Sequence, residues 1–438
     1  MHEHHLRQIV KKQKSGIAQG ICSICSANRF VFQAALEHGR KRGTVVLIES
    51  TSNQVNQYGG YTGMTPQDFI DLATSTAREV QFSLERLILG GDHLGPNPWK
   101  NEPAGEALQK ACVLVRDYVY AGFTKIHLDA SMHLADDAGD RSKPLDPKIV
   151  AERTAPLCEA AEAGYLERLK EVPDALVPVY VIGTEVPVPG GVQGCEAGLS
   201  VTTAGDFSET VQLTRAAFAE RGLEEVWERV VGVVVQPGVE FGDDFIHEYD
   251  RDKARELSQE VAKYPNVVFE GHSTDYQTPQ ALRQLVEDGV AILKVGPELT
   301  YAFREALFLL EHIERELFAG RDAELSDLKN VLLDVMLSEP GYWEPYYRGE
   351  GSELEFTLKY SLSDRIRYYW PHERAAETLA KLIANLDSVD IPLALVSQYM
   401  PVQYRKIRAG EIQNKADDLI KDRIAEVLEK YRYATQPQ

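Results

Sequence analysis

The sequence is poor in cysteine, and this shortage excludes a disulfide-stapled protein. Its 438 residues hold five cysteines, too few and too scattered for a disulfide framework. Cys22 and Cys25 form a C-x-x-C motif, but no second such motif exists to complete a zinc site. Because the pair lies in the apolar run GICSIC, we interpret its thiols as buried and inert.

Positive charge is also scarce. The chain has 47 Lys and Arg against 67 Asp and Glu, which gives a formal net charge of −20. No basic stripe offsets this charge, so we expect no binding to nucleic acid or to an anionic membrane. An anionic substrate would have to be held by a local cluster of donor groups.

Long apolar runs are missing as well. No stretch approaches the run of about 18 apolar residues that a membrane-spanning helix needs. The N-terminal segment MHEHHLRQIVKKQKSG lacks the apolar region of a secretory signal, so we predict a cytoplasmic protein. We interpret the histidines of MHEHH as part of a solvated terminus.

Short apolar runs, by contrast, recur through the first two thirds of the chain. Each is rich in Val, Ile or Leu, as expected for a strand buried on both faces of a parallel sheet. The eight runs are GIAQGICSIC (16–25), TVVLIES (44–50), RLILGGDH (86–93), TKIHLDAS (124–131), VPVYVIGTE (177–185), VVGVVVQPG (230–238), NVVFEGHS (266–273) and AILKVGPE (291–298).

Helical patterns separate these runs. PQALRQLVEDG is one example, with Thr278 as the predicted N-cap and Gly289 as the predicted end. Eight such units predict a (β/α)8 TIM barrel over residues 1–320. A doubly wound open sheet is the alternative, but no G-x-G-x-x-G follows the first run. Beyond the barrel the pattern is helical, which predicts a mostly helical C-terminal extension over 321–438.

Polar residues follow the predicted strands where a barrel places its active site. Acidic and imidazole groups at the exits of the third, fourth, fifth and seventh strands predict a first-row divalent-metal site. The candidate residues at the exits are Ser23, Ser26, Asn28, Glu49, Ser52, Asn53, Asp92, His93, His127, Asp129, Glu185, Gln236, His272, Ser273, Asp275, Lys294 and Gly296.

Two of these residues lie on one side of the fourth strand. His127 and Asp129 are two positions apart, so their side chains point the same way. If that side faces the barrel interior, Asp129 is nearer the mouth. We therefore expect Asp129 to be functional and His127 to lie one layer behind it.

The segment LILGGDHLGPNPW resembles the GGDHLGPN signature of the GatZ/KbaZ family, which comprises class II tagatose-1,6-bisphosphate aldolase subunits and related 4-epimerases. KIHLDASM, GTEVPVPGG, FEGHSTDYQTP, LKVGPELT and YSLSDRIRYYWP resemble further segments of that family. These matches cover most of the chain.

The resemblance implies roles for single residues. In related class II aldolases an Asp-His pair supplies a catalytic acid/base and a zinc ligand, which implies Asp92 and His93 here. His272 in EGHST is similar to a further ligand histidine. Glu185 in GTEVP and Asp129 would complete the ligand set and are further candidate catalytic carboxylates. Because this set departs from three histidines, the expected cofactor is a divalent metal, Zn²⁺ or Mn²⁺.

Two places could hold a substrate phosphate. Backbone N–H groups around Gly271, Ser273 and Gly296 could cradle it, as barrels do after their last two strands. Arg365 and Arg367 in SDRIRYYW could supply charge-assisted contacts instead. The alternative for that segment is a capped helix start with solvated arginines.

The expected chemistry is cleavage between C3 and C4 of a ketohexose phosphate. A divalent cation would stabilise the enediolate charge, and Asp92 would take the proton of the C4 hydroxyl. A Schiff-base route would use Lys125 or Lys294, but the concentration of metal-type ligands favours the metal route. Asn53 and Lys294 are also candidates for substrate contacts.

Inversion at C4 offers a related activity. The C4 hydrogen of a 2-ketose is not acidic, so inversion needs transient oxidation or retro-aldol cleavage and re-closure. No dinucleotide fingerprint is present. We therefore predict a tagatose(-6-phosphate) 4-epimerase or an aldolase of galactitol or tagatose catabolism. The alternative is a non-catalytic subunit that stabilises a separate tagatose-bisphosphate aldolase catalytic subunit; an oligomer is expected in either case.

Overall fold

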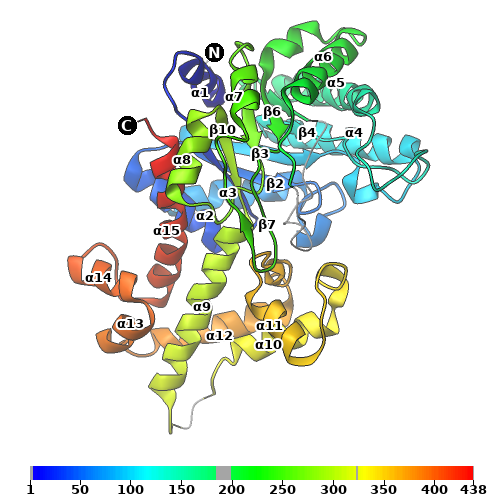
Figure 1. The fold of residues 1–438 in the computed structure, drawn as a ribbon. Helices are drawn as coiled ribbons and strands as arrows, with labels where there is room; N and C mark the ends of the chain where they lie inside the picture. Colours follow the sequence, from blue (N-terminus) through cyan, green and yellow to red (C-terminus); the bar gives the residue numbers. More distant parts are fainter. Residues whose placement is uncertain (1–2, 184–198, 322–323, 438) are drawn as a thin grey trace.

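The computed structural model of the protein describes residues 3–183, 199–321 and 324–437. At its centre lies a closed barrel of eight parallel strands, which confirms the predicted (β/α)8 fold (Figure 1). The strands follow one another around the ring in chain order. They are β1 (Ile21–Cys25), β2 (Val46–Thr51), β3 (Leu87–Leu94), β4 (Lys125–Leu128), β5 (Val179–Ile182), β6 (Val230–Val235), β9 (Val268–Gly271) and β10 (Val290–Val295).

Helices cover the outside of the barrel, one after most strands. Their starts follow the predicted chemistry: the Thr278 hydroxyl accepts the N–H of Ala281, and Pro279 opens α8. The outer helices are α2 (Arg29–Arg42), α3 (Pro66–Glu79), α4 (Ala104–Ala121), α5 (Pro147–Glu171), α6 (Ala204–Ala219), α7 (Arg255–Val261), α8 (Pro279–Glu287) and α9 (Pro297–Phe318), with short 3-10 turns at Gly60–Thr62, Leu84–Arg86, Asn97–Trp99 and Glu224–Arg229.

Helix α1 (His5–Lys14) closes the N-terminal end of the barrel. Its Leu6, Ile9 and Val10 are buried in one cluster with inward-facing strand residues such as Leu47 and Val181. This apolar plug leaves the opposite, C-terminal mouth as the open end of the barrel.

His4 corrects the prediction of a solvated N-terminal segment. Its side chain is 1% exposed. Nδ1 accepts the N–H of Leu6 at 3.1 Å, and Nε2 lies 3.2 Å from the Thr124 hydroxyl. Burial lowers the pKa of His4 to about 3. The prediction was wrong because both ring nitrogens find partners and the ring caps α1.

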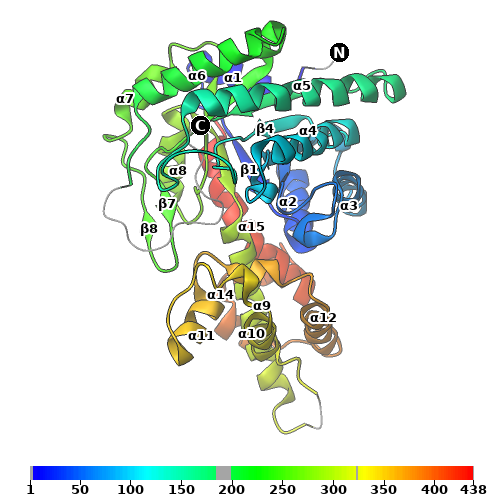
Figure 2. The ribbon, with the colours of Figure 1, turned by 90° about the vertical axis from the view of Figure 1, so that its right-hand side faces the viewer.

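The C-terminal part is helical, as predicted, and most of it forms a lobe over the barrel mouth (Figures 1 and 2). The long helix α9 leads into the lobe. The final helix returns and packs against α2, α8 and α9 on the barrel. The domain boundary at residue 320 stays a prediction. The elements are α10 (Leu328–Ser338), a 3-10 turn at Pro340–Tyr342, α11 (Gly351–Tyr360), a 3-10 turn at Arg365–Tyr368, α12 (Glu373–Asp387), α13 (Leu393–Tyr399), α14 (Pro401–Ala409) and α15 (Ala416–Thr435).

A small hairpin connects the barrel mouth to the lobe. Its strands, β7 (Glu240–Phe241) and β8 (Ile246–His247), pair antiparallel after β6. The Asp243 carboxylate between them accepts hydrogen bonds from the hydroxyls of Ser361 and Ser363, at 3.0 and 3.1 Å. The lobe is thereby held next to the strand exits. In the described part of the chain no helix has both the length and the apolar character that crossing a bilayer requires.

Candidate active site

A cavity of about 100 Å³ lies at the C-terminal mouth, between the strand exits and the lobe. It brings together residues from both halves of the chain. Of the residues predicted from the sequence, its walls include Asn53, Asp92, His93, His272, Ser273, Lys294, Gly296 and Arg367.

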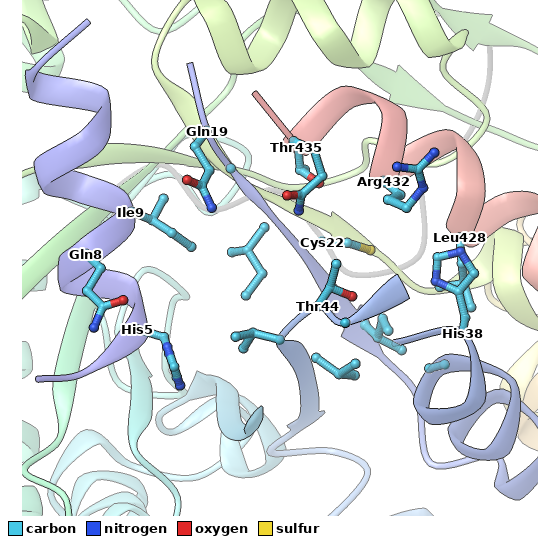
Figure 3. Close-up of a pocket in the computed structure, with 18 of the residues that line it drawn as sticks. His5, Gln8, Ile9, Gln19, Cys22, His38, Thr44, Leu428, Arg432 and Thr435 are labelled. Atoms are coloured by element: carbon cyan, nitrogen blue, oxygen red, sulfur yellow. The ribbon is translucent and has the colours of Figure 1, made fainter. Parts of the chain in front are cut away.

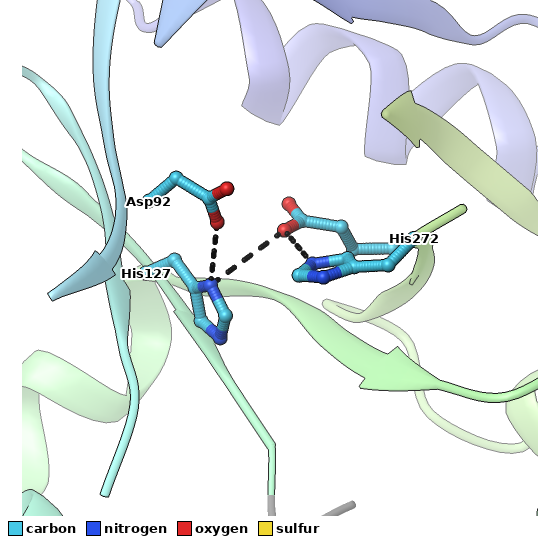
Figure 4. A group of neighbouring side chains, drawn as sticks. Asp92, His127 and His272 are labelled. Atoms are coloured by element: carbon cyan, nitrogen blue, oxygen red, sulfur yellow. Dashed lines mark hydrogen bonds and ion pairs between the residues drawn. The ribbon is translucent and has the colours of Figure 1, made fainter. Parts of the chain in front are cut away.

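Four buried side chains, two of which line this cavity, could hold a metal ion (Figure 4). Asp92, His127, Glu270 and His272 offer ligand atoms that all lie within 4.8 Å of one another. Oδ1 of Asp92 is 2.9 Å from Nδ1 of His127, and Oε1 of Glu270 is 3.0 Å from Nε2 of His272. Oxygen and imidazole ligands suit Zn²⁺ and Mn²⁺.

The chemistry of this group fits a divalent cation. Nδ1 of His127 faces the carboxylates of Asp92 and Glu270, at 2.9 and 4.0 Å (Figure 4), and Nε2 of the same ring has no hydrogen-bond partner among the described residues. Burial lowers the pKa of His272 to about 3, although Glu270 opposes this shift, so its ring is neutral and able to bind a metal. Two carboxylates and two imidazoles thus face one point without any sulfur.

Of the expected ligands the group contains only His272, and it adds Asp92, which was expected as the acid/base. It contains His127 and Glu270, which the sequence analysis did not place among the ligands. It lacks His93 and Asp129. Instead, Nδ1 of His93 lies 2.8 Å from Oδ2 of Asp129. Such a carboxylate fixes the orientation of a histidine ring, and here it directs His93 toward Asp92, whose Oδ2 is 3.7 Å from Nε2.

Two buried lysines lie behind the four side chains. Nζ of Lys125 is 2.7 Å from both Glu49 and Glu270. Nζ of Lys294 is 2.5 Å from both Glu49 and Asp92. Lys294 also lies 3.6 Å from Glu270. The two lysines and the three carboxylates therefore hold one another in place inside the barrel.

Burial opposes charge on these groups, but their neighbours outweigh it. Burial lowers the pKa of Lys125, yet Glu270 and Glu49 raise it above the ordinary lysine value. The pKa of Lys294 is raised likewise, by Asp92 above all. Burial raises the pKa of Asp92, but His93 and Lys294 bring it well below the ordinary value. Asp92 is therefore a carboxylate, and both lysines are protonated.

The GGDHLG segment explains how β3 delivers Asp92 and His93. A Cβ on Gly90 would come within 2.7 Å of the Glu49 side chain, so glycine makes room for that carboxylate. A Cβ on Gly95 would lie 1.7 Å from the backbone oxygen of Asp129. His93 has φ of 47°, a left-handed conformation that costs free energy and is enriched at functional sites.

Other predicted residues lie elsewhere. Glu185 falls outside the described residues. Arg365 is buried and stacks on Tyr346, 3.2 Å from the ring centre, rather than lining the mouth cavity. Cys22 and Cys25 form no disulfide with each other. Cys25 lines the mouth cavity, with Sγ 3.7 Å from Oδ2 of Asp92, and burial raises the pKa of its thiol.

Glu270 is the main residue that the sequence analysis missed. A glutamate inside the apolar run NVVFEGHS is itself a signal, because a buried carboxylate needs a partner. It is two positions before His272, so both point into the barrel.

A larger cavity, of about 290 Å³, lies at the opposite end of the barrel (Figure 3). It is bounded by α1, the start of β1, α2 and α15, and Cys22 lines it. None of the four candidate metal ligands lines this cavity. The candidate active site is therefore the smaller cavity at the mouth.

Comparisons with known proteins agree on one family. Residues 6–436 match the family model described as D-tagatose-1,6-bisphosphate aldolase subunit GatZ/KbaZ-like. The GatZ subunit of that aldolase from Salmonella agona is 50% identical over 432 residues, covering 99% of each chain. The Klebsiella pneumoniae GatZ subunit is 50% identical over 428 residues, covering 98% of each. A Sinorhizobium meliloti structure, described as a probable tagatose 6-phosphate kinase, is 46% identical with a TM-score of 0.85, covering 95% of this chain and 100% of that one.

Proposed function

Because the chain belongs to the GatZ/KbaZ family of D-tagatose-1,6-bisphosphate aldolase subunits, we propose that it is itself a metal-dependent enzyme that acts on a ketohexose phosphate. The proposed reaction breaks the C3–C4 bond by retro-aldol chemistry. Re-closure on the other face makes a tagatose(-6-phosphate) 4-epimerase. Protonation of the enediolate at C3, with the proton taken from the C4 hydroxyl, followed by release of both fragments makes an aldolase. The buried group of Asp92, His127, Glu270 and His272 carries this proposal.

Three of these residues are the proposed metal ligands. His127, Glu270 and His272 would hold a divalent ion, Zn²⁺ or Mn²⁺, and leave a position open for substrate, as catalytic sites do. When bound, the ion would act as a Lewis acid toward the charge of the enediolate. Glu185 stays a predicted addition to this set.

Asp92 is the proposed acid/base. As a carboxylate it accepts the proton of the C4 hydroxyl while the C3–C4 bond breaks. The electron pair of that bond passes to the enediolate, and C4 becomes an aldehyde. On re-closure Asp92 returns the proton to the new C4 oxygen. Its contacts with Lys294 and His127 keep the carboxylate in place for both steps.

The lysines argue against the Schiff-base alternative. A lysine nucleophile needs a lowered pKa, whereas the pKa values of Lys125 and Lys294 are both raised. Lys125 is also paired with two carboxylates and Lys294 with three. We therefore assign them to charge balance and to positioning of Glu49, Glu270 and Asp92.

The experiment is turnover by the purified chain alone. The protein is stripped with EDTA, then supplied with Mn²⁺ or Zn²⁺ and either D-tagatose 6-phosphate or D-tagatose 1,6-bisphosphate. Metal-dependent formation of the fructose epimer supports a 4-epimerase, and triose phosphates support an aldolase. No product with any metal would overturn the enzymatic proposal.

A second candidate function rests on the names of the relatives. The 50% identical proteins are called aldolase subunits, which favours a role beside a separate catalytic chain. On this proposal the protein joins an oligomer in the cytoplasm and stabilises its partner. Adding it to a purified tagatose-bisphosphate aldolase catalytic subunit would then raise that subunit's thermal stability, with no turnover by this chain alone.

A further inference from the structure

In this protein a carboxyl group already accepts hydrogen bonds from the backbone N–H groups that usually bind phosphate in a barrel. The backbone N–H groups of Gly296 and Glu298, at the start of α9, both donate to Oδ1 of Asp275, at 2.9 and 2.8 Å. Asp275 is buried. These two N–H groups are therefore not free to bind a phosphate. A phosphate at this place would also lie next to the Asp275 carboxyl group.

Lys294 and Arg367, the cationic side chains that line the mouth cavity, differ in whether carboxylates lie close enough to balance their charge. Lys294 is paired with Glu49 and Asp92. Arg367, in the lobe, lines the same cavity and has no carboxylate within 4.0 Å among the described residues. Asp364, three positions before it, pairs with Arg304 instead, at 3.1 Å. The Arg367 guanidinium donates to the backbone oxygens of Ser363 and Asp364 and to the Tyr368 hydroxyl, and none of these acceptors is a carboxylate. Arg367 is thus the cavity cation whose charge no carboxylate balances.

Arg367 also faces a second hollow. This hollow, of about 220 Å³, shares Cys25, Gln54, Tyr61 and Arg367 with the mouth cavity, so the two adjoin. It lies between the segment after β1, which contributes Ser26 and Asn28, and the lobe segment that contributes Arg367 and Trp370.

Trp370 adds an independent observation. Its indole Nε1 is buried and has no hydrogen-bond partner in the part of the chain that the structure describes. A buried N–H without an acceptor costs free energy, and Trp370 lines the hollow, so an acceptor bound there would have an unused donor beside it. An indole N–H and a guanidinium are both donors without acceptor capacity, which suits a phosphate.

We propose that the hollow between Ser26–Asn28 and Arg367–Trp370 binds the phosphate of the substrate. It takes a ketose monophosphate, with the reacting carbons over Asp92 and the phosphate held by the lobe. The proposal rests on the proposed function for the identity of the sugar. It gives the lobe a function, because without the lobe the mouth would lack its uncompensated cation.

The first test compares phosphorylated and free sugar. R367M should raise the KM for D-tagatose 6-phosphate 10-fold or more, and W370F should raise it by a smaller factor. In both variants the KM for free D-tagatose should rise by a smaller factor than the KM for D-tagatose 6-phosphate, because the free sugar has no phosphate to lose contact with. R408M is the matched control, since Arg408 also lies beside a tyrosine but on α14, away from both hollows. Equal losses on both sugars would overturn the proposal.

The second test does not depend on catalysis. Calorimetry measures binding of inorganic phosphate and of D-tagatose 6-phosphate to wild type, R367K, R367M and R408M. We expect binding to weaken 10-fold or more in R367M, to be partly kept in R367K and to be unchanged in R408M. If the wild type turns over no sugar yet shows this pattern, the enzymatic proposal fails and the phosphate site stands. Unchanged binding by a folded R367M rules the site out.

Discussion

The ammonium group of Lys125 lies 2.7 Å from a carboxylate oxygen of Glu270, and solvent reaches neither side chain. Lys125 therefore holds in place a carboxylate that we propose as a metal ligand. Its other partner, Glu49, also contacts Lys294, and Lys294 in turn contacts Asp92. The barrel interior thus joins the proposed ligand and the proposed acid/base in one set of paired charges.

Replacing Lys125 with Met should destabilise the fold by about 3–5 kcal/mol, because the buried carboxylates of Glu49 and Glu270 lose a cation 2.7 Å away and then share Lys294 alone. Chemical denaturation measures the loss. Added Mn²⁺ should restore more stability to K125M than to the wild type, since the ion supplies the missing positive charge. K148M is the control, because Lys148 forms an exposed pair with Glu152. A K125M protein as stable as K148M would contradict this role.

The substitution E270Q should abolish tight metal binding. Removing a ligating carboxylate lowers affinity for a hard divalent ion, and bound metal per chain after dialysis should fall to near zero. H272N should do the same. E152Q, at an exposed glutamate, should keep the wild-type metal content. Full metal content in both E270Q and H272N would place the ion elsewhere.

D92N should lower kcat about 10²–10⁴-fold while KM for D-tagatose 6-phosphate changes little, because the proton acceptor is lost but the proposed ligands stay. Steady-state kinetics with a measurement of metal content checks this. If D92N instead loses its metal, Asp92 is a ligand and not the acid/base.

Borohydride should not trap a covalent sugar adduct on this protein. Lys125 and Lys294 are protonated and paired, so neither forms an imine with the substrate. Reduction with sodium borohydride in the presence of D-tagatose 6-phosphate should leave the mass and the activity unchanged. A mass increase of one substrate fragment on either lysine would support the Schiff-base route instead.

The barrel could be predicted because its signals are local. Each strand is a short apolar run, and each helix has its own starting and ending residues. The rule that strand ends converge at one mouth then led to Asp92, His93 and His272, which all line the mouth cavity. Their chemical roles stay predictions.

How deep each side chain lies within the barrel could not be predicted in the same way. Alternation shows that His127 and Asp129 share one side of a strand, but it does not show which of them reaches the centre. In the structure His127 belongs to the four side chains that could hold a metal ion, whereas Asp129 lies beside them and contacts His93. The difference arises from how far each strand is shifted along its neighbours, which sequence periodicity does not report.

Contacts between segments far apart in the chain could not be predicted from the sequence either. Arg367 follows β1 by more than 300 residues, yet it lines a hollow with Ser26 and Asn28. Its position depends on α9, on the lobe and on the Asp243 hairpin together. The placement of His4 beneath the barrel is a similar case, since Thr124 is 120 residues away.

The most direct test of the account is the anomalous scattering of Mn²⁺ in crystals of the protein. We predict one strong peak at the barrel mouth, about 2.0–2.3 Å from ligand atoms of His127, Glu270 and His272, and its loss in E270Q crystals. The absence of a peak there in fully loaded wild-type crystals, or a peak bound by other residues, would contradict it.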